Sequence, residues 1–120
     1  MIETLTIGKD IVESKGFLFD YLYPYLLRFT KRNGIPFNEN IEISESFVTD
    51  FLQILEVSLQ DLLDDCYEVP THKQLSKFST RYQKIYLGDR PYVVDYRKDI
   101  VGKIAYRIYS LIVRVKDIKT

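Results

Sequence analysis

The chain has 120 residues, of which 46% are hydrophobic and 28% charged, and its formal net charge at pH 7 is zero. This is the size and composition of one folded domain, 1–120, and it excludes a largely disordered chain. The only cysteine, Cys66, excludes an internal disulfide framework, so we expect a reducing, cytoplasmic setting. We expect neither a signal peptide nor a membrane span, because no apolar run approaches the necessary length.

The zero net charge hides a strong asymmetry between the two halves. Residues 1–66 hold five basic and twelve acidic residues, whereas residues 67–120 hold twelve basic and five acidic residues. No Lys or Arg occurs between Asn33 and His72. Such a division marks either a partner-binding surface or two halves that pack together and neutralise each other.

The first predicted helix runs from Asp10 to Arg32. Asp10 can cap its start, and Asn33-Gly34 can end it, since both residues tolerate the left-handed conformation. Pro24 lies inside this segment and is expected to kink the helix, because proline removes a backbone hydrogen bond. Alternating aromatic residues between Phe17 and Tyr25 also fit a strand, but the leucines between them favour a helix. The expected core residues are Ile11, Leu18, Leu22, Leu26 and Phe29.

The second predicted helix runs from Ser44 to Cys66 and has the clearest pattern. Ser44 is a good N-cap, and Glu45 suits the positive end of the helix dipole. The apolar residues recur at helical spacing, and the polar residues, including Asp50, follow the opposite face. The expected buried stripe contains Phe47, Phe51, Leu55, Leu59, Leu62 and Leu63.

Two further helices are predicted in the basic half. One runs from a capping box at Thr71 and Gln74 to about Tyr86, and the turn Gly88–Pro91 follows it. The last covers roughly Tyr92 to Asp117, with its β-branched residues held in the helix by packing. Its expected core residues are Ile100, Ile104, Ile108, Leu111, Ile112 and Val115.

Four amphipathic helices with short links predict an all-α, single-domain bundle. A strand at Thr4–Ile7 or at Val93–Val94 would be a minor addition. The order of helices also fits, loosely, a histone-like unit that completes its core with a partner chain.

The sequence contains no catalytic or metal-binding motif, so we expect a protein without enzymatic activity, cofactor or metal. His72 is the only histidine, and it starts a predicted helix as an exposed polar residue. Cys66 ends an apolar stripe and is expected to be a small core residue. Asp61, Asp64, Asp65 and Glu68 cluster without the spacing of a calcium loop and are expected to face solvent.

The basic half is rich in tyrosine, and this mixture predicts a binding surface. Tyrosine and arginine are the usual anchors of protein interfaces, so the leading expectation is a protein–protein interaction module that binds a partner or a second copy. The alternative is a nucleic-acid binder, with cations on phosphates and rings on bases. The candidate surface contains Tyr96, Arg97, Lys98, Lys103, Arg107 and Arg114.

Overall fold

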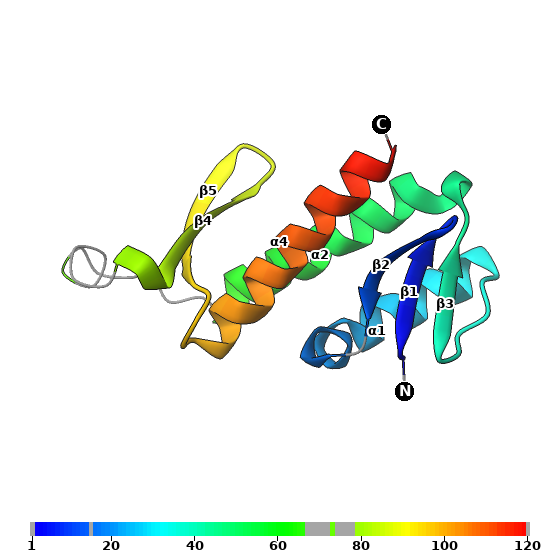
Figure 1. Ribbon diagram of the computed structural model, residues 1–120, viewed down its shortest axis with the longest axis horizontal. Helices are drawn as coiled ribbons and strands as arrows, with labels where there is room; N and C mark the ends of the chain where they lie inside the picture. Colours follow the sequence, from blue (N-terminus) through cyan, green and yellow to red (C-terminus); the bar gives the residue numbers. More distant parts are fainter. Residues whose placement is uncertain (1, 15, 67–72, 74–78, 120) are drawn as a thin grey trace.

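A computed structural model describes residues 2–14, 16–66, 73 and 79–119 (Figure 1). The described residues form three α-helices, five strands in two sheets and two short 3₁₀ helices. The expected all-α bundle is therefore wrong, and the fold is α+β. The strands equally exclude the histone-like arrangement.

The first sheet forms at the N-terminus, where only a minor strand was expected. Strands β1 (Thr4–Ile7) and β2 (Asp10–Ser14) make an antiparallel hairpin, and β3 (Asn40–Ile43) pairs with β1 in parallel. The sheet order is β2-β1-β3. The two-residue turn Gly8-Lys9 joins the hairpin, with Gly8 at φ 58°, a conformation that glycine adopts without steric cost.

Helix α1 (Phe17–Asn33) links β2 to β3 and starts later than the sequence predicted. Asp10 begins a strand rather than capping a helix, and Ile11 is 64% exposed instead of buried. The helix continues through Pro24, where the proline and the preceding-turn residue Asp20 are both exposed to water. It ends at Gly34, whose φ of 66° confirms the predicted stop.

Helix α2 (Val48–Cys66) follows the 3₁₀ turn η1 (Glu45–Phe47) and confirms the second predicted helix. All the expected core positions from Phe51 to Leu63 are buried, and Phe47 is half-buried in η1. Ser44 occupies the cap position but makes no capping hydrogen bond, because its hydroxyl contacts that of Ser46.

The region expected to hold the third and fourth helices differs most from the prediction. Glu68, the capping box at Thr71 and Gln74, and also His72, lie outside the described residues. After η2 (Ser79–Arg81), strands β4 (Tyr82–Leu87) and β5 (Arg90–Asp95) form an antiparallel hairpin. The turn predicted at Gly88 is present, but it joins strands instead of helices, since a two-residue turn between segments that contain tyrosine and the β-branched Ile85, Val93 and Val94 favours a hairpin.

Helix α4 (Ile100–Lys119) begins eight residues later than the predicted Tyr92. Its buried face includes Ile108, Leu111, Ile112 and Val115, as expected, whereas Ile100 is 71% exposed. Helices α2 and α4 lie side by side through the centre of an elongated molecule of 48 × 30 × 23 Å (Figure 1). The three-stranded sheet lies at one end of this helix pair and the β4–β5 hairpin at the other.

Candidate binding surface at the base of the hairpin

Asp95 organises the chain where β5 ends and α4 is about to begin. Its carboxylate is buried, and its Oδ1 atom accepts the backbone N–H groups of Arg97 at 3.1 Å and Lys98 at 2.9 Å. The Oδ2 atom accepts both Nε, at 3.1 Å, and Nη2 of Arg81. Burial opposes ionisation of Asp95, but these hydrogen bonds, that from Arg81 foremost, outweigh it and hold the pKa of Asp95 below its usual range.

Gly102 lets α4 pack directly against this strand end. A Cβ atom at Gly102 would lie only 2.1 Å from the carbonyl oxygen of Asp95. Asp99 caps the helix nearby, because its Oδ2 accepts the Gly102 N–H at 3.3 Å and its carbonyl accepts the Lys103 N–H at 2.8 Å. The short loop 96–99 is therefore fixed at both ends.

This loop holds Tyr96, Arg97 and Lys98 in a defined arrangement. The ring of Tyr96 packs on that of Tyr106 from α4, with centroids 5.0 Å apart. The Arg97 guanidinium lies 5.5 Å from the centre of the Tyr96 ring, and its Nε donates to the Tyr96 hydroxyl at 3.2 Å. The two tyrosines are half-buried, whereas Arg97 and Lys98 are exposed. A rigid aromatic pair with cations beside it is a typical protein-binding surface.

The aromatic surface continues along α4 toward the hairpin. Tyr109 lies one turn beyond Tyr106, and its ring is 6.5 Å from that of Tyr86 on β4. Tyr86 is 45% exposed. Tyr86 pairs with Pro91 close to the turn of the hairpin, so this second contact lies away from Asp95. We call Tyr96 and Tyr106, with Arg97 and Lys98, the hairpin-base surface. The predicted Lys103 is half-buried on α4.

Two of the predicted surface cations are exposed and also contact the N-terminal sheet. Arg107 Nη2 donates to both carboxylate oxygens of Glu13 on β2 at 2.8 Å, and Glu13 is 7% exposed. Arg114 donates to the carbonyl of Val12, which a β-bulge leaves without a partner residue on β1. Both arginines therefore tie α4 to the sheet, although both remain exposed to solvent, the Arg107 side chain at 46%.

The contacts between acidic and basic halves are only partly those expected. Arg107 meets the acidic half at β2 instead of at the second helix, while Lys116 reaches Glu56 on α2 at 4.0 Å. Asp61, expected to face solvent, is half-buried and accepts the hydroxyl of Tyr25 at 2.7 Å. Burial and this carboxylate raise the pKa of Tyr25.

Sequence reasoning missed the two residues that position the surface, Asp95 and Gly102. The sequence does carry a signal for Gly102, since a lone glycine within an apolar helical pattern marks a close approach of two backbones. Asp95 gave no such signal, because its partner Arg81 and the two N–H groups come together only in the folded chain.

Across residues 2–14, 16–66, 73 and 79–119, no three His, Cys, Asp or Glu side chains gather where they could hold a metal ion. The helices in the same ranges are too short or too polar to cross a membrane. Cys66 is the last residue of α2.

The chain matches no protein-family model, and neither a curated protein nor a solved structure is significantly similar to it. Function must therefore be argued from the geometry of the chain itself.

Proposed function

We propose that this protein is a cytoplasmic, non-catalytic interaction module that binds a protein partner with an acidic surface, in the manner of an adaptor, inhibitor or assembly factor. The observation that carries the proposal is the Tyr96–Tyr106 pair with Arg97 held beside it. Tyrosine and arginine contribute most strongly to protein interfaces when they are fixed in place before binding. Asp95 and Gly102 provide that fixation here.

The distribution of cations favours a protein partner over a nucleic acid. A polynucleotide requires several phosphate contacts along an extended basic track. Arg107 and Arg114, which would extend such a track along α4, are exposed but already bonded to Glu13 and Val12, so a phosphate would compete with these contacts. Arg97 and Lys98 are exposed neighbours in the loop 96–99 beside the Tyr96–Tyr106 pair, which suits one acidic patch on a folded partner.

A charge-reversal experiment tests the proposal. The wild-type protein and the variant Arg97→Glu/Lys98→Glu are immobilised and exposed to nuclease-treated lysate of the native cell, and bound proteins are identified by mass spectrometry. The control Lys9→Glu/Lys31→Glu changes the same charge at exposed positions on other elements. We expect a specific partner to be retained by the wild type and the control and lost by the variant. Equal retention by all three proteins would refute the assignment of this surface.

Binding to nucleic acid is measured directly as the competing outcome. Fluorescence anisotropy with labelled single-stranded DNA and RNA should show no tight binding near physiological salt, about 0.15 M. Tight binding that weakens steeply as salt rises, and that Arg97→Glu/Lys98→Glu abolishes, would show that this surface binds a polynucleotide and not a protein. Analytical ultracentrifugation distinguishes a separate partner from a second copy of the chain.

A further inference from the structure

We propose that the outer edge of strand β3 accepts an extended, basic peptide segment of a partner protein as an added strand. This site lies on a different part of the molecule from the hairpin-base surface, and the inference stands independently of the function proposed above. It rests on the hydrogen-bonding pattern of the edge, the hollow beside it and its charge.

The backbone of β3 leaves hydrogen-bonding groups free on its outer side. The carbonyl of Glu39 accepts the Thr4 N–H at 3.1 Å, and that of Ile43 accepts the Gly8 N–H at 3.0 Å. Because residues alternate along a parallel ladder, Ile41 also bonds toward β1, and the N–H and C=O groups of Asn40 and Glu42 point outward. In the described part of the chain, β3 is the last strand of its sheet on this side.

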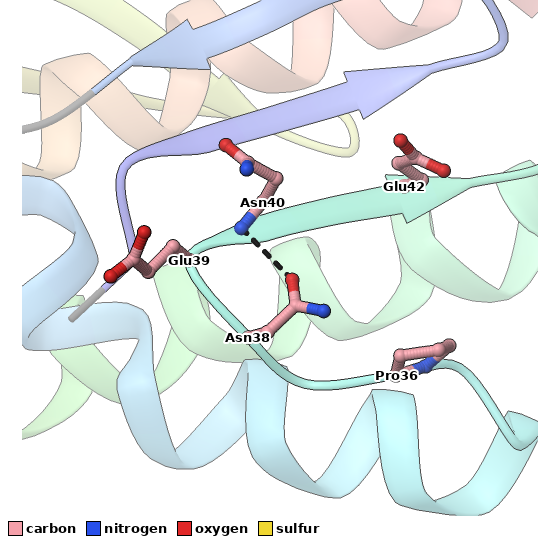
Figure 2. Close-up of a pocket in the computed structure, with 5 residues that line it drawn as sticks. All are labelled: Pro36, Asn38, Glu39, Asn40 and Glu42. Carbon is pink, nitrogen blue, oxygen red and sulfur yellow. Dashed lines mark hydrogen bonds between the residues drawn. The ribbon is translucent and has the colours of Figure 1, made fainter.

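One outward group is already occupied, and it shows how an added strand would be held. The Asn38 Oδ1 atom accepts the Asn40 N–H at 3.0 Å, where the carbonyl of a neighbouring strand would otherwise bond (Figure 2). The described residues donate or accept no hydrogen bond at the Glu42 N–H or carbonyl. The backbone groups available to an added strand are therefore the carbonyl of Asn40 and the N–H and carbonyl of Glu42.

A hollow of 560 Å³ lies along this edge and gives a peptide room to approach. Figure 2 shows the strand on one side and the loop that carries Pro36 and Asn38 on the other. The residues that line the hollow are Pro36, Asn38, Glu39, Asn40 and Glu42. An extended peptide of about four residues, roughly 13 Å long, matches the length of β3.

The acidic residues at the β3 edge favour a basic peptide over a second copy of the same edge. Glu39 and Glu42 line the hollow, and no Lys or Arg lies between Asn33 and His72. Charged side chains on an edge strand deter pairing with neutral strands and with identical edges, since like charges opposite each other are destabilising. A second copy docking β3 against β3 would meet that repulsion. A peptide with lysine or arginine at alternate positions places its cations beside Glu42 and its other side chains on the opposite face.

The test uses a short synthetic peptide of alternating lysine and valine with blocked ends, titrated into the full chain by calorimetry at low salt. Two further versions carry backbone N-methyl groups on one alternate set of residues or on the other. Only one set faces β3 in an added strand, so we expect one methylated version to bind at least about tenfold more weakly and the other to match the parent. Purely electrostatic binding would weaken neither version, and this result would overturn the proposal.

Variants and amide exchange locate the bound peptide. Glu42→Lys should lower the affinity at least about tenfold and Glu42→Gln less, while Asp89→Lys, an equal charge change in the β4–β5 turn, should leave it unchanged. Circular dichroism verifies that each variant is folded. The parent peptide should slow hydrogen exchange at the Glu42 amide. No binding of the parent peptide, or equal affinity of Glu42→Lys and the wild type, would also overturn the proposal.

Discussion

Helix α2 and the base of the β4–β5 hairpin are held in place by different forces. Apolar burial fixes α2, because Phe51, Leu55 and Leu59 are at most 1% exposed and lie on one face. The hairpin base is fixed by the polar contacts of Asp95 and by the close approach of Gly102. Apolar contacts are non-directional and tolerate small displacements, whereas hydrogen bonds to one carboxylate fix the positions of particular atoms. The hairpin base is therefore the region suited to holding a binding surface in one geometry.

The largest effect is expected in the core beneath α2. Phe51 is fully buried, and its ring lies 5.3 Å from that of Phe29 on α1. Phe51→Ala should lower the free energy of unfolding by about 3–5 kcal/mol, because it leaves a cavity between two helices. Val57→Ala, at a position on the same helix that is 47% exposed, should change it by less than about 0.5 kcal/mol. Urea denaturation followed by circular dichroism measures both, and similar losses would contradict the assigned helix face.

The next effect tests whether the hairpin base depends on steric fit. Gly102→Ala should cost about 3 kcal/mol, because the new methyl group would overlap the Asp95 backbone and push α4 from β5. Gly34→Ala is the matched comparison, since Gly34 has a φ of 66° but no atom within 4 Å of the added Cβ. Its cost should be about 1 kcal/mol, from backbone strain alone. Equal losses in thermal unfolding would mean that the close contact at Gly102 relaxes without cost.

The contrast between α2 and the β4–β5 hairpin also explains which parts of the fold could be predicted from the sequence. Helix α2 was predicted correctly because its apolar period continues for five turns and cannot fit a strand. The β4–β5 region was mistaken for helix because Tyr82, Ile85 and Tyr86 also satisfy helical spacing over a short run. The stronger signal was the pair of two-residue turns, Gly8-Lys9 and Gly88-Asp89, each with glycine first and with β-branched residues in the segments on either side.

The candidate site was only partly predictable for a related reason. Tyr96, Arg97 and Lys98 are adjacent in the sequence, so their clustering could be predicted without the structure. The contacts of Arg107 with Glu13 and of Arg114 with Val12 span 94 and 102 residues along the chain. The Val12 carbonyl is available because of the β2 bulge, which no residue pattern of α4 could indicate.

A smaller effect is expected from the charge of Asp95. Asp95→Asn keeps an oxygen for the Arg97 and Lys98 N–H groups but places an amide beside Arg81, and should cost about 2 kcal/mol at pH 7. Because the folded-state pKa of Asp95 is depressed, its contribution is complete above the unfolded value of about 3.9 and is lost as the pH falls through the folded value. The stability difference between wild type and variant should therefore narrow in urea titrations below about pH 4. If the stability difference between the wild type and Asp95→Asn did not change with pH, the ionised form of Asp95 could not be the source of that difference.

The smallest effect concerns Asp50, which the helical pattern of α2 places on the polar face, where substitution should be almost neutral. The structure gives it a different role. Its two carboxylate oxygens accept Arg32 Nη2 at 2.8 Å, and one of them also accepts Asn33 Nδ2 at 2.9 Å, so Asp50 ties the end of α1 to the start of α2. The hydrogen bond from Asn33, with the contribution of Arg32, lowers the pKa of Asp50.

Asp50→Ala should therefore cost about 1 kcal/mol at pH 7, a modest amount because Arg32 is largely exposed and solvent screens the pair. Gln53→Ala, exposed on the same helix, is the control and should change the stability by less than about 0.5 kcal/mol. Asn33→Ala should cost less in the Asp50→Ala background than in the wild type, since the Asn33–Asp50 hydrogen bond is already absent there and only the bond of Asn33 to the Phe29 carbonyl is lost. Additive losses in this double-mutant cycle would show that the Asn33–Asp50 hydrogen bond contributes little, and that each residue stabilises the helix junction through its other contacts, Asp50 with Arg32 and Asn33 with the Phe29 carbonyl.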